Sequence, residues 1–251
     1  MRRAMPMPDF SRLAPAWALL RLREFGVARA RCPFCGPVFA VRLRAEESAI
    51  RCTGCGATPV HWALGMAIHR YVPQLDRADV CELSARGPLA AHLRRRARRA
   101  MLSEFFADAA PGTERGGVRC EDVQQLSYAD SSFDLATCTE VLEHVPDDAA
   151  AFAELRRVLR PGGRLLFTVP LHDAPTLERA RLSGNGVEHL AAPVYHRDPL
   201  RAGAGILAFR DYGRDIVERL RRAGFTEAWI DDGEPGAAPF GRTRPVICAR
   251  R

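Results

Sequence analysis

The chain has 251 residues, more than one typical domain, and this length fits one α/β core with a small additional module. Its apolar share of 47% is ordinary for a globular protein, and no stretch approaches the roughly 20 uncharged residues that a membrane span requires. The net charge of +7 rests on arginine alone, because the chain contains no lysine. The use of arginine alone is more typical of the base composition of a genome than of a surface selected to bind phosphate groups, so we do not favour nucleic acid as a partner. Because no apolar stretch is long enough to span a membrane, we also expect no membrane partner.

The N-terminal residues 1–30 are expected to form a lead-in interrupted by proline, with one helix that presents Trp17 and Phe25 to the main domain. A secretion signal would need a longer apolar run than residues 16–20 and a small-residue cleavage site after it, where charged residues stand instead. We therefore predict a cytoplasmic protein.

Residues 31–60 contain two Cys-x-x-Cys pairs, Cys32 with Cys35 and Cys52 with Cys55, separated by sixteen residues. This spacing lets each pair form a tight turn that directs both sulfurs at one tetrahedral Zn²⁺. Four thiolates close the coordination sphere, so a structural metal is expected rather than a catalytic one. The alternatives are free thiols or a redox dithiol, but a redox pair belongs at the start of a helix in a βαβ unit, and neither pair has that context.

Residues 61–77 are expected to form a linking helix, and from Ala78 onward strands alternate with helices. Strands are predicted over 78–83, 100–104, 118–122, 133–139, 163–169, 226–231 and 245–250, and helices over 88–98, 147–158 and 212–223. Alternation of this kind is typical of a mostly parallel sheet with helices on both faces. The pattern predicts one α/β domain over residues 78–251, with a seven-stranded sheet and a long insertion over 171–207.

Two segments of this domain carry a family resemblance. Residues 132–148 read SFDLATCTEVLEHVPDD, and residues 157–170 read RVLRPGGRLLFTVP. In this order and at this spacing they resemble class I S-adenosylmethionine-dependent methyltransferases, and the likeness extends over about residues 78–170 and more loosely over 208–251. It implies a Rossmann-like, doubly wound sheet with S-adenosylmethionine as the cofactor. The Pro-Gly-Gly sequence at 161–163 is expected to end a helix and lead into the next strand.

The resemblance also implies which residues hold the cofactor. Glu104, at the end of the second predicted strand, would bind the ribose hydroxyls, and Asp122 with Val123, after the third, would lie at the adenine. Thr139, at the end of the fourth, completes this set. Taken without the resemblance, Glu104 and Asp122 are also compatible with ordinary carboxylates of a loop or a helix start.

The loop after the first predicted strand departs from the family pattern. The family usually shows several glycines here, which let the backbone pass close to the methionine part of the ligand. Glu82 matches the acidic position before the loop, but Ser84 and Arg86 stand where glycines are usual, and only Gly87 remains. Arg86 is suited to bind the cofactor carboxylate, and it is equally able to block the pocket.

Methyl transfer to an oxygen acceptor requires positioning of the acceptor and removal of its proton. The insertion over 171–207 is expected to form a lid that sets acceptor specificity, and its His189 is our first choice for a general base, with a solvated loop histidine as the alternative. His144, in the family motif after the fourth strand, is the second choice, and it is equally suited to fix its loop by hydrogen bonding. Further polar candidates near this edge are Glu143, His172, Asp173, Glu188, Tyr195 and His196.

Three functions remain open at this point. The favoured one is methyl transfer to a small-molecule or sugar-like acceptor, with oxygen as the expected acceptor atom. The second is an RNA methyltransferase in which the zinc module and the arginine cluster Arg94, Arg95, Arg96, Arg98 and Arg99 bind RNA, although a solvated helix face explains the same arginines. The third is a binding module without catalysis, suggested by the altered loop at 84–88. The sequence carries no signal for an oligomeric state.

Overall fold

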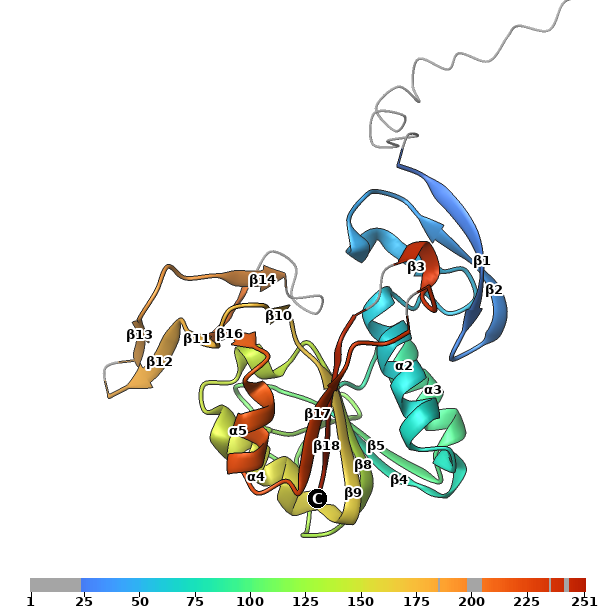
Figure 1. Ribbon diagram of the computed structural model, residues 1–251. Helices are drawn as coiled ribbons and strands as arrows, with labels where there is room; N and C mark the ends of the chain where they lie inside the picture. Colours follow the sequence, from blue (N-terminus) through green and yellow to red (C-terminus); the bar gives the residue numbers. More distant parts are fainter. Residues whose placement is uncertain (1–23, 185, 198–204, 235, 242–243) are drawn as a thin grey trace, which may run out of the picture.

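The computed structural model describes residues 24–184, 186–197, 205–234, 236–241 and 244–251. Figure 1 shows three parts: a small sheet near the N-terminus, a large sheet covered by helices on both faces, and an arm of short strands that projects from one end of the large sheet. Residues 1–23 of the predicted lead-in lie outside the described residues. Most of the predicted helix, including Trp17, falls in these residues, and in the described remainder of the lead-in a strand begins at Gly26.

The small sheet contains strands β1 (Gly26–Cys32), β2 (Gly36–Arg42) and β3 (Ile50–Cys52), which are antiparallel in that order. Exposure alternates along β1 and most of β2, as in a sheet with one face toward solvent. The β1–β2 hairpin closes at the pair Cys32 and Gly36, where Gly36 adopts a φ of 81° that glycine tolerates. A 3-10 turn, η2 (Glu47–Ala49), precedes β3.

The predicted linking helix corresponds to α2 (Pro59–Tyr71), which is followed by the 3-10 turn η3 (Leu75–Arg77). Thr58 and His61 form a reciprocal capping box at the start of α2, which satisfies N–H groups that the helix leaves unpaired. The helix lies in one hydrophobic core with buried residues of both sheets, among them Trp62 and Ile68 of α2, Cys32 and Phe34 beside it, and Leu135 and Leu166 of the large sheet. The small sheet is therefore packed onto the main domain rather than tethered to it.

The large sheet has eight strands within the described residues, in the order β17-β18-β9-β8-β4-β5-β7-β6. Their bounds are β4 Asp79–Glu82, β5 Arg99–Glu104, β6 Glu114–Arg115, β7 Val118–Cys120, β8 Phe133–Thr139, β9 Leu159–Thr168, β17 Glu227–Asp231 and β18 Val246–Arg250. The pairings from β9 through β8, β4 and β5 to β7 are parallel, and those at both edges are antiparallel. This is the predicted Rossmann-like, mostly parallel sheet, with the two-residue edge strand β6 in addition to the seven strands expected.

Helices cover both faces of this sheet (Figure 1). One face carries α2 and α3 (Gly87–Arg96), and the other carries α4 (Asp148–Val158) and α5 (Ile216–Arg222). Successive residues of a central strand face opposite cores, since Leu166 of β9 belongs to the α2–α3 core and Phe167 to the α4–α5 core. Burial on both faces explains why β8 and the second half of β9 are almost continuously apolar.

The Pro-Gly-Gly sequence at 161–163 does not end a helix, contrary to the expectation. Helix α4 ends at Val158, and β9 begins directly afterwards. The register between β8 and β9 shifts between Phe133 and Leu135, so residues of β9 that include Gly162, with a φ of 80°, bulge out of the ladder. The glycines therefore accommodate a strand bulge, which requires the same backbone freedom as a helix cap.

In its described residues, the insertion predicted over 171–207 contains short strands. They are β10 Leu171–His172, β11 Leu177–Glu178, β12 Ala180–Ser183, β13 Gly186–His189, β14 Tyr195–Arg197 and β15 Gly205–Leu207, and β16 Arg210–Gly213 follows. β12 pairs with β13, β14 pairs with β15, and β16 lies between β10 and β11. We call residues 171–213 the arm; Figure 1 shows its β12–β13 hairpin farthest from the large sheet.

Of the helices in the described part of the chain, none combines the length and the apolar character that crossing a membrane requires.

Candidate functional site

The carboxyl ends of the parallel strands meet at one edge of the large sheet, the edge from which the arm projects (Figure 1). In open α/β sheets the crevice at this edge is where ligands bind. Strands β4, β5, β8 and β9 end there at Glu82, Glu104, Thr139 and Thr168. The family-implied cofactor residues are thus brought to a common edge.

Glu82 lies at the floor of this edge. Its side chain is buried, with 1% of the residue exposed, and Thr137 of the neighbouring strand donates a hydrogen bond to its carboxylate. Burial raises the pKa of Glu82 to about 8, so this carboxyl group carries its proton at neutral pH. Glu82 is therefore a neutral group at the end of β4.

The altered loop after β4 is tied to β5 by Glu104. The Ala85 N–H donates to Glu104 Oε1 at 3.0 Å, and Ser84 Oγ lies 3.4 Å from the same oxygen. Arg86 is exposed at the start of α3, and Gly87 follows with a φ of 88°. One glycine is therefore retained at the position where this loop needs a left-handed backbone.

Asp122 follows β7 and organises its own turn. Its Oδ1 accepts hydrogen bonds from the Gln124 N–H at 2.9 Å and from Gln124 Nε2 at 3.1 Å. The next residue, Val123, is 7% exposed and packs in the α4–α5 core. At the end of β8, the buried Thr139 Oγ1 has no hydrogen-bond partner among the described residues.

A cluster of one carboxylate and two imidazoles lies at the same edge. Glu143 and His144 belong to the 3-10 turn η4 (Leu142–His144) after β8, and His196 comes from β14 of the arm. His196 Nδ1 lies 3.2 Å from His144 Nε2, and a Glu143 oxygen lies 3.6 Å from His144 Nε2 and 3.7 Å from His196 Nδ1. The three ligand atoms lie within 4.8 Å of one another, so one small ion or one proton can be shared among them.

The carboxylate of this cluster, Glu143, and Oε1 of the nearby Glu140 lack hydrogen-bond donors in the described part of the chain. Glu143 is 2% exposed, yet neither of its oxygens has a hydrogen-bond partner among the described residues, and the same holds for Glu140 Oε1. Burial, followed by the charge of Glu143, raises the pKa of Glu140 to about 7, and Glu143 raises the pKa of His196. Glu140 also has a φ of 51°, a left-handed backbone that costs energy for a residue other than glycine and is found most often at functional sites.

The structure does not bring His189 to this cluster. His189 ends β13, where it is exposed and its Cα pairs with Ala180. His172 is also exposed, on β10. His144 is the predicted catalytic residue that does lie here, and His196, which sequence reasoning named only as a polar residue of the insertion, lies beside it. No local pattern indicates this contact, because the two histidines are brought together by the arm folding back.

The four cysteines of the two pairs lie together at one end of the small sheet. Cys32 Sγ lies 3.7 Å from Cys55 Sγ, and Cys35 Sγ lies 3.5 Å from Cys52 Sγ. Four sulfurs at about 2.3 Å from a tetrahedral ion would be about 3.8 Å apart, so the arrangement fits the metal that the spacing predicts. Burial raises the pKa of Cys55 to about 11, so a bound cation would be needed to keep its thiol ionised.

The predicted arginine cluster is divided between two environments. Arg98 and Arg99 form ion pairs with the buried Asp79 at 2.5 and 3.4 Å, and Arg160 joins them at 2.9 Å. These contacts, the hydrogen bond from Arg98 first, hold the pKa of Asp79 below its usual range. The remaining three arginines, Arg94, Arg95 and Arg96, are exposed in the last turn of α3. Part of the cluster is therefore structural.

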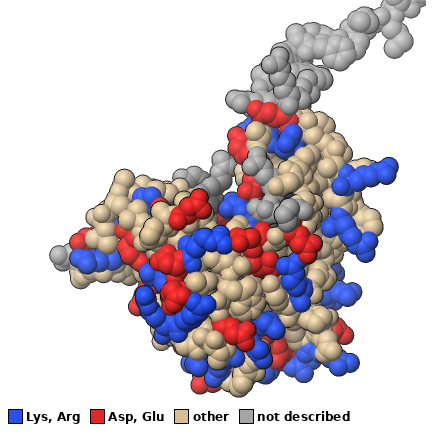
Figure 2. Space-filling view, in the orientation of Figure 1, with Lys and Arg blue, Asp and Glu red and all other residues tan. Residues whose placement is uncertain are grey.

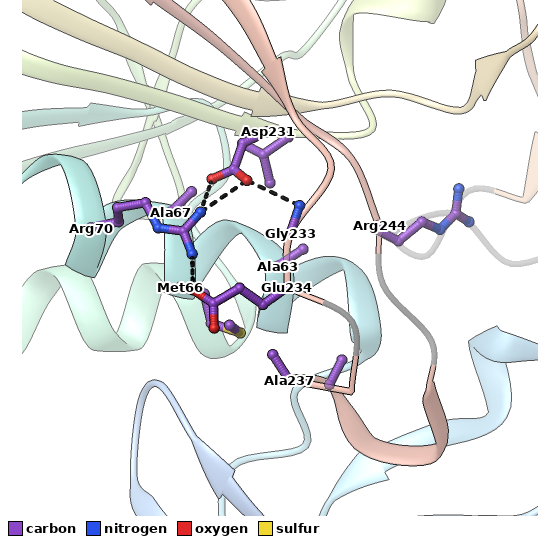
Figure 3. A pocket seen from close by; sticks show the side chains of 11 residues that line it. Ala63, Met66, Ala67, Arg70, Asp231, Gly233, Glu234, Ala237 and Arg244 are labelled. Atoms are coloured by element: carbon purple, nitrogen blue, oxygen red, sulfur yellow. Dashed lines mark hydrogen bonds and ion pairs between the residues drawn. The ribbon is translucent and has the colours of Figure 1, made fainter.

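A small cavity of about 20 Å³ lies between α2 and the segment after β17, and Figure 3 shows its lining. Arg70 of α2 donates to Asp231 at 2.9 Å and to Glu234 at 2.7 Å across it. A space of this size holds about one water molecule and no cofactor. The contacts fix α2, and with it the small sheet, against the end of β17.

Comparisons with known proteins give partial matches. Residues 69–167, from the end of α2 to β9, match the model of the methyltransferase domain family. The chain is 38% identical over 50 residues to the ubiquinone biosynthesis O-methyltransferase of Coxiella burnetii, covering 20% of this chain and 21% of that protein. It is 40% identical over 72 residues to the 27-O-demethylrifamycin SV methyltransferase of Amycolatopsis mediterranei, covering 26% of each.

A third relative is an uncharacterized 37.1 kDa protein in transposon TN4556 of Streptomyces fradiae, 48% identical over 61 residues, which are 24% of this chain and 18% of that protein. The chain thus spans between 18% and 26% of the length of these relatives. Among solved structures, the 1,6-didemethyltoxoflavin-N1-methyltransferase of Burkholderia thailandensis with bound S-adenosylhomocysteine is 20% identical with a TM-score of 0.49, covering 77% of this chain and 78% of that one.

Proposed function

We propose that this protein is an S-adenosylmethionine-dependent methyltransferase that transfers a methyl group to an oxygen atom of a small-molecule or sugar-like acceptor. The observation that carries the proposal is the coincidence of two groups at one edge of the sheet. Carboxylates at the strand ends of the family-matched segment are suited to the cofactor, and the cluster of Glu143, His144 and His196 is suited to an acceptor hydroxyl. An in-line transfer needs both ligands at one place, with the reacting atoms about 3–3.5 Å apart.

In this proposal the first loop binds the methionine part of the cofactor, with Arg86 directed to its carboxylate above the neutral Glu82. Glu104 holds the ribose, since a carboxylate that accepts from the Ala85 N–H has further lone pairs for hydroxyl groups. Asp122 and the backbone of Val123 hold the adenine. Thr139 Oγ1, buried without a partner, supplies one more polar contact.

The oxygen acceptor is supported by the chemistry of the cluster. A hydroxyl must lose its proton as it attacks the methyl carbon, and two imidazoles beside a carboxylate can assist that loss. One matched relative is an O-methyltransferase by name, and another is named for a 27-O-demethyl acceptor. We assign the acceptor to the cluster that contains His144 and His196, and in this assignment His189 has no catalytic role.

We further propose that Cys32, Cys35, Cys52 and Cys55 bind one Zn²⁺ that stabilises the small sheet. The sulfur distances support a closed tetrahedral site, which has no open position for a substrate. A thiolate site of this kind is compatible with the cytoplasmic location that the sequence predicts.

The test is a calorimetric titration of the zinc-loaded protein with S-adenosylmethionine. We expect micromolar binding that Glu104→Ala or Asp122→Ala weakens at least tenfold, while Glu227→Ala, which removes an exposed carboxylate paired with Arg250, leaves it unchanged. The absence of binding by a folded, zinc-loaded sample would overturn the proposal and favour a binding module without catalysis.

One observation favours RNA as an alternative acceptor. A groove of about 1010 Å³ between the small sheet, α2 and α3 is lined by Arg31, Arg70, Arg96, His69 and His92. Figure 2 shows basic side chains along this side of the molecule, while both signs mix over the rest of the visible face. An RNA enzyme would retain RNA through purification and release it steeply with salt, whereas the small-molecule proposal predicts neither.

A further inference from the structure

The described part of the fold buries the carboxylate of Glu143 without supplying hydrogen bonds to it. A carboxylate that is 2% exposed and accepts no hydrogen bond from the described residues is costly unless an opposite charge compensates it. The nearest candidates are the imidazoles of His144 and His196, at 3.6 and 3.7 Å, which are charged only when protonated. The carboxylate thus faces two nitrogen atoms that are themselves good metal ligands.

We propose that Glu143, His144 and His196 bind one divalent cation, separate from the zinc of the four cysteines. The ligand atoms would be a Glu143 oxygen, His144 Nε2 and His196 Nδ1, which lie within 4.8 Å of one another. A cation at their centre compensates the buried carboxylate and takes the place of the hydrogen bond that joins His196 Nδ1 and His144 Nε2 at 3.2 Å. Two imidazoles and a carboxylate suit a cation of intermediate hardness such as Fe²⁺ or Zn²⁺, and Mn²⁺, which is harder, binds the same ligands more weakly and serves as a paramagnetic probe.

The surroundings of His144 prepare it for this role. His144 Nδ1 lies 2.9 Å from the Leu207 carbonyl oxygen, which accepts only, so Nδ1 carries the proton and Nε2 presents its lone pair to the cluster. Leu207 ends β15, the strand paired with β14 that carries His196. One hairpin therefore supplies one ligand and orients another.

The base of the hairpin is fixed to the turn that carries Glu143. The Phe209 N–H donates to the Glu143 carbonyl oxygen at 2.8 Å, and Arg210 donates to the carbonyl oxygens of Val145 and Pro146 at 2.5 and 2.7 Å. Arg210 is 2% exposed, so these contacts are shielded from water. The three ligands are thus held by two connected segments, as a preformed metal site requires.

The site also implies the class of acceptor, an inference that rests on the proposed function. Three protein ligands leave coordination positions free, and an acceptor with two adjacent oxygen atoms, such as a catechol or a vicinal diol, would fill two of them. Coordination lowers the pKa of the hydroxyl. With His144 Nε2 and His196 Nδ1 bound to the cation, the cation replaces the imidazoles in assisting proton loss: the hydroxyl proton passes to water, the oxygen electron pair forms a bond to the methyl carbon, and the carbon–sulfur bond breaks, leaving its electrons on S-adenosylhomocysteine.

The experiment uses the full chain loaded with one Zn²⁺ per chain, so that the second site is not filled by zinc, and counts bound Mn²⁺ from the loss of the electron paramagnetic resonance signal of free Mn²⁺. We expect one Mn²⁺ per chain, with affinity at least tenfold weaker in Glu143→Gln and in His196→Ala. Glu188→Gln is the matched control, because it removes an exposed carboxylate of the same arm that pairs with Arg181, and it should bind Mn²⁺ like the parent. Unchanged melting curves and zinc content show that each variant is folded.

The acceptor class is tested on the same sample by the relaxation of water protons near Mn²⁺. Catechol should displace bound water and lower the relaxation enhancement, while phenol, with one oxygen, should not. Absence of Mn²⁺ binding, or binding that neither cluster variant weakens, would overturn the metal site. An equal response to catechol and phenol would overturn the acceptor class. The calorimetric titration with S-adenosylmethionine, run with and without Mn²⁺, separates these failures from a failure of the proposed function.

Discussion

The small sheet and the arm are both additions to the same large sheet, but different kinds of contact attach them to it. The small sheet shares a hydrophobic core with α2, α3 and the central strands, and its cysteine turns belong to that core. The outer hairpin of the arm has almost no core: every residue of β13 is exposed, and Leu182 and Val187 are 59% and 46% exposed. At its root, Tyr212 and Leu171 contact the α4–α5 core, and polar contacts add to them.

The root of the arm is a buried polar network. Arg210 donates to three carbonyl oxygens of the segment 142–146, and the Tyr212 hydroxyl donates to Asp148 at 2.9 Å. Arg219 of α5 pairs with the same Asp148 at 2.7 Å. Hydrophobic cores tolerate gradual change, whereas such networks depend on each member. We infer that the small sheet stabilises the fold and that the arm positions the ligands of the acceptor site.

The substitution with the largest expected effect destabilises the small sheet. Cys52→Ser removes one of four metal ligands, and because a structural zinc site contributes folding free energy directly, we expect a loss of about 4 kcal/mol or more and a melting temperature lower by about 10 °C or more. Cys248→Ala is the control: it removes a buried thiol from the same core but outside the cluster, at a cost of about 1 kcal/mol. Equal losses in the two variants, or indifference of the parent to a strong chelator, would contradict the zinc assignment.

The substitution with the next largest effect disrupts the polar network at the root of the arm. Arg210→Met keeps much of the side-chain volume but leaves buried carbonyl oxygens without donors, so we expect a loss of about 3 kcal/mol in chemical denaturation. Mn²⁺ binding should weaken as well, because Arg210 holds the turn that carries Glu143. Arg214→Met, which removes an exposed pair with Asp232, should cost less than about 0.5 kcal/mol. If Arg210→Met left Mn²⁺ affinity unchanged, the arm would not depend on this network for its position.

Glu82 of the large sheet should make the stability of the protein depend on pH. Glu82 has a pKa of about 8 in the folded protein against an ordinary value near 4.5, so the folded state retains a proton that the unfolded state releases. Stability from this group is therefore present at low pH and is lost as the pH rises through about 8. Each pH unit in this range corresponds to about 1.4 kcal/mol, so we expect the contribution of Glu82 to the free energy of unfolding to fall by about 2 kcal/mol between pH 5.5 and 7.

Glu82→Gln should remove the part of this slope that Glu82 contributes, while Glu140, whose pKa burial raises to about 7, contributes a slope of the same sign that the variant retains. The informative quantity is the difference between the variant and the parent, because burial lowers the pKa values of His61 and His92 to about 4 and these groups give an opposite slope in acid. Parallel stability curves for the two proteins would show that Glu82 is ionised in the fold.

The sequence predicts the elements that are buried on both faces better than those that are not. Strand β8 was expected over 133–139 and has those bounds, because a strand between two helix layers must be continuously apolar. Strand β1 was missed although its alternation of small residues with arginine, Ala28-Arg29-Ala30-Arg31, has the period of a strand. The bulge at Gly162 was mistaken for a helix cap, because both need a positive φ.

The residues of the candidate site also differ in how well the sequence predicts them. The cysteine pairs and His144 are indicated by local spacing and motif, so the sequence is sufficient to nominate them. His196 depends on β14 returning to η4, and this return is fixed by Arg210 and by the Phe209 N–H rather than by any periodic pattern. His189 has the same chemistry but lies on the exposed hairpin, so residue type alone did not distinguish the two.

The smallest expected effect compares the surface ion pairs of Arg70, on the helix that packs against the small sheet, with the ion pair of Arg181 in the arm. Arg70→Ala removes the pairs with Asp231 and Glu234, and since the Asp231 side chain is only 10% exposed, we expect a loss of about 1 kcal/mol. Arg181→Ala removes a pair with Glu188 whose partners are 63% and 43% exposed, and it should cost less than about 0.5 kcal/mol. Urea denaturation of both variants measures the difference. A loss for Arg181→Ala as large as that for Arg70→Ala would mean that the outer hairpin is as firmly coupled to global stability as α2, and the division into a stabilising small sheet and a positioning arm would then be wrong.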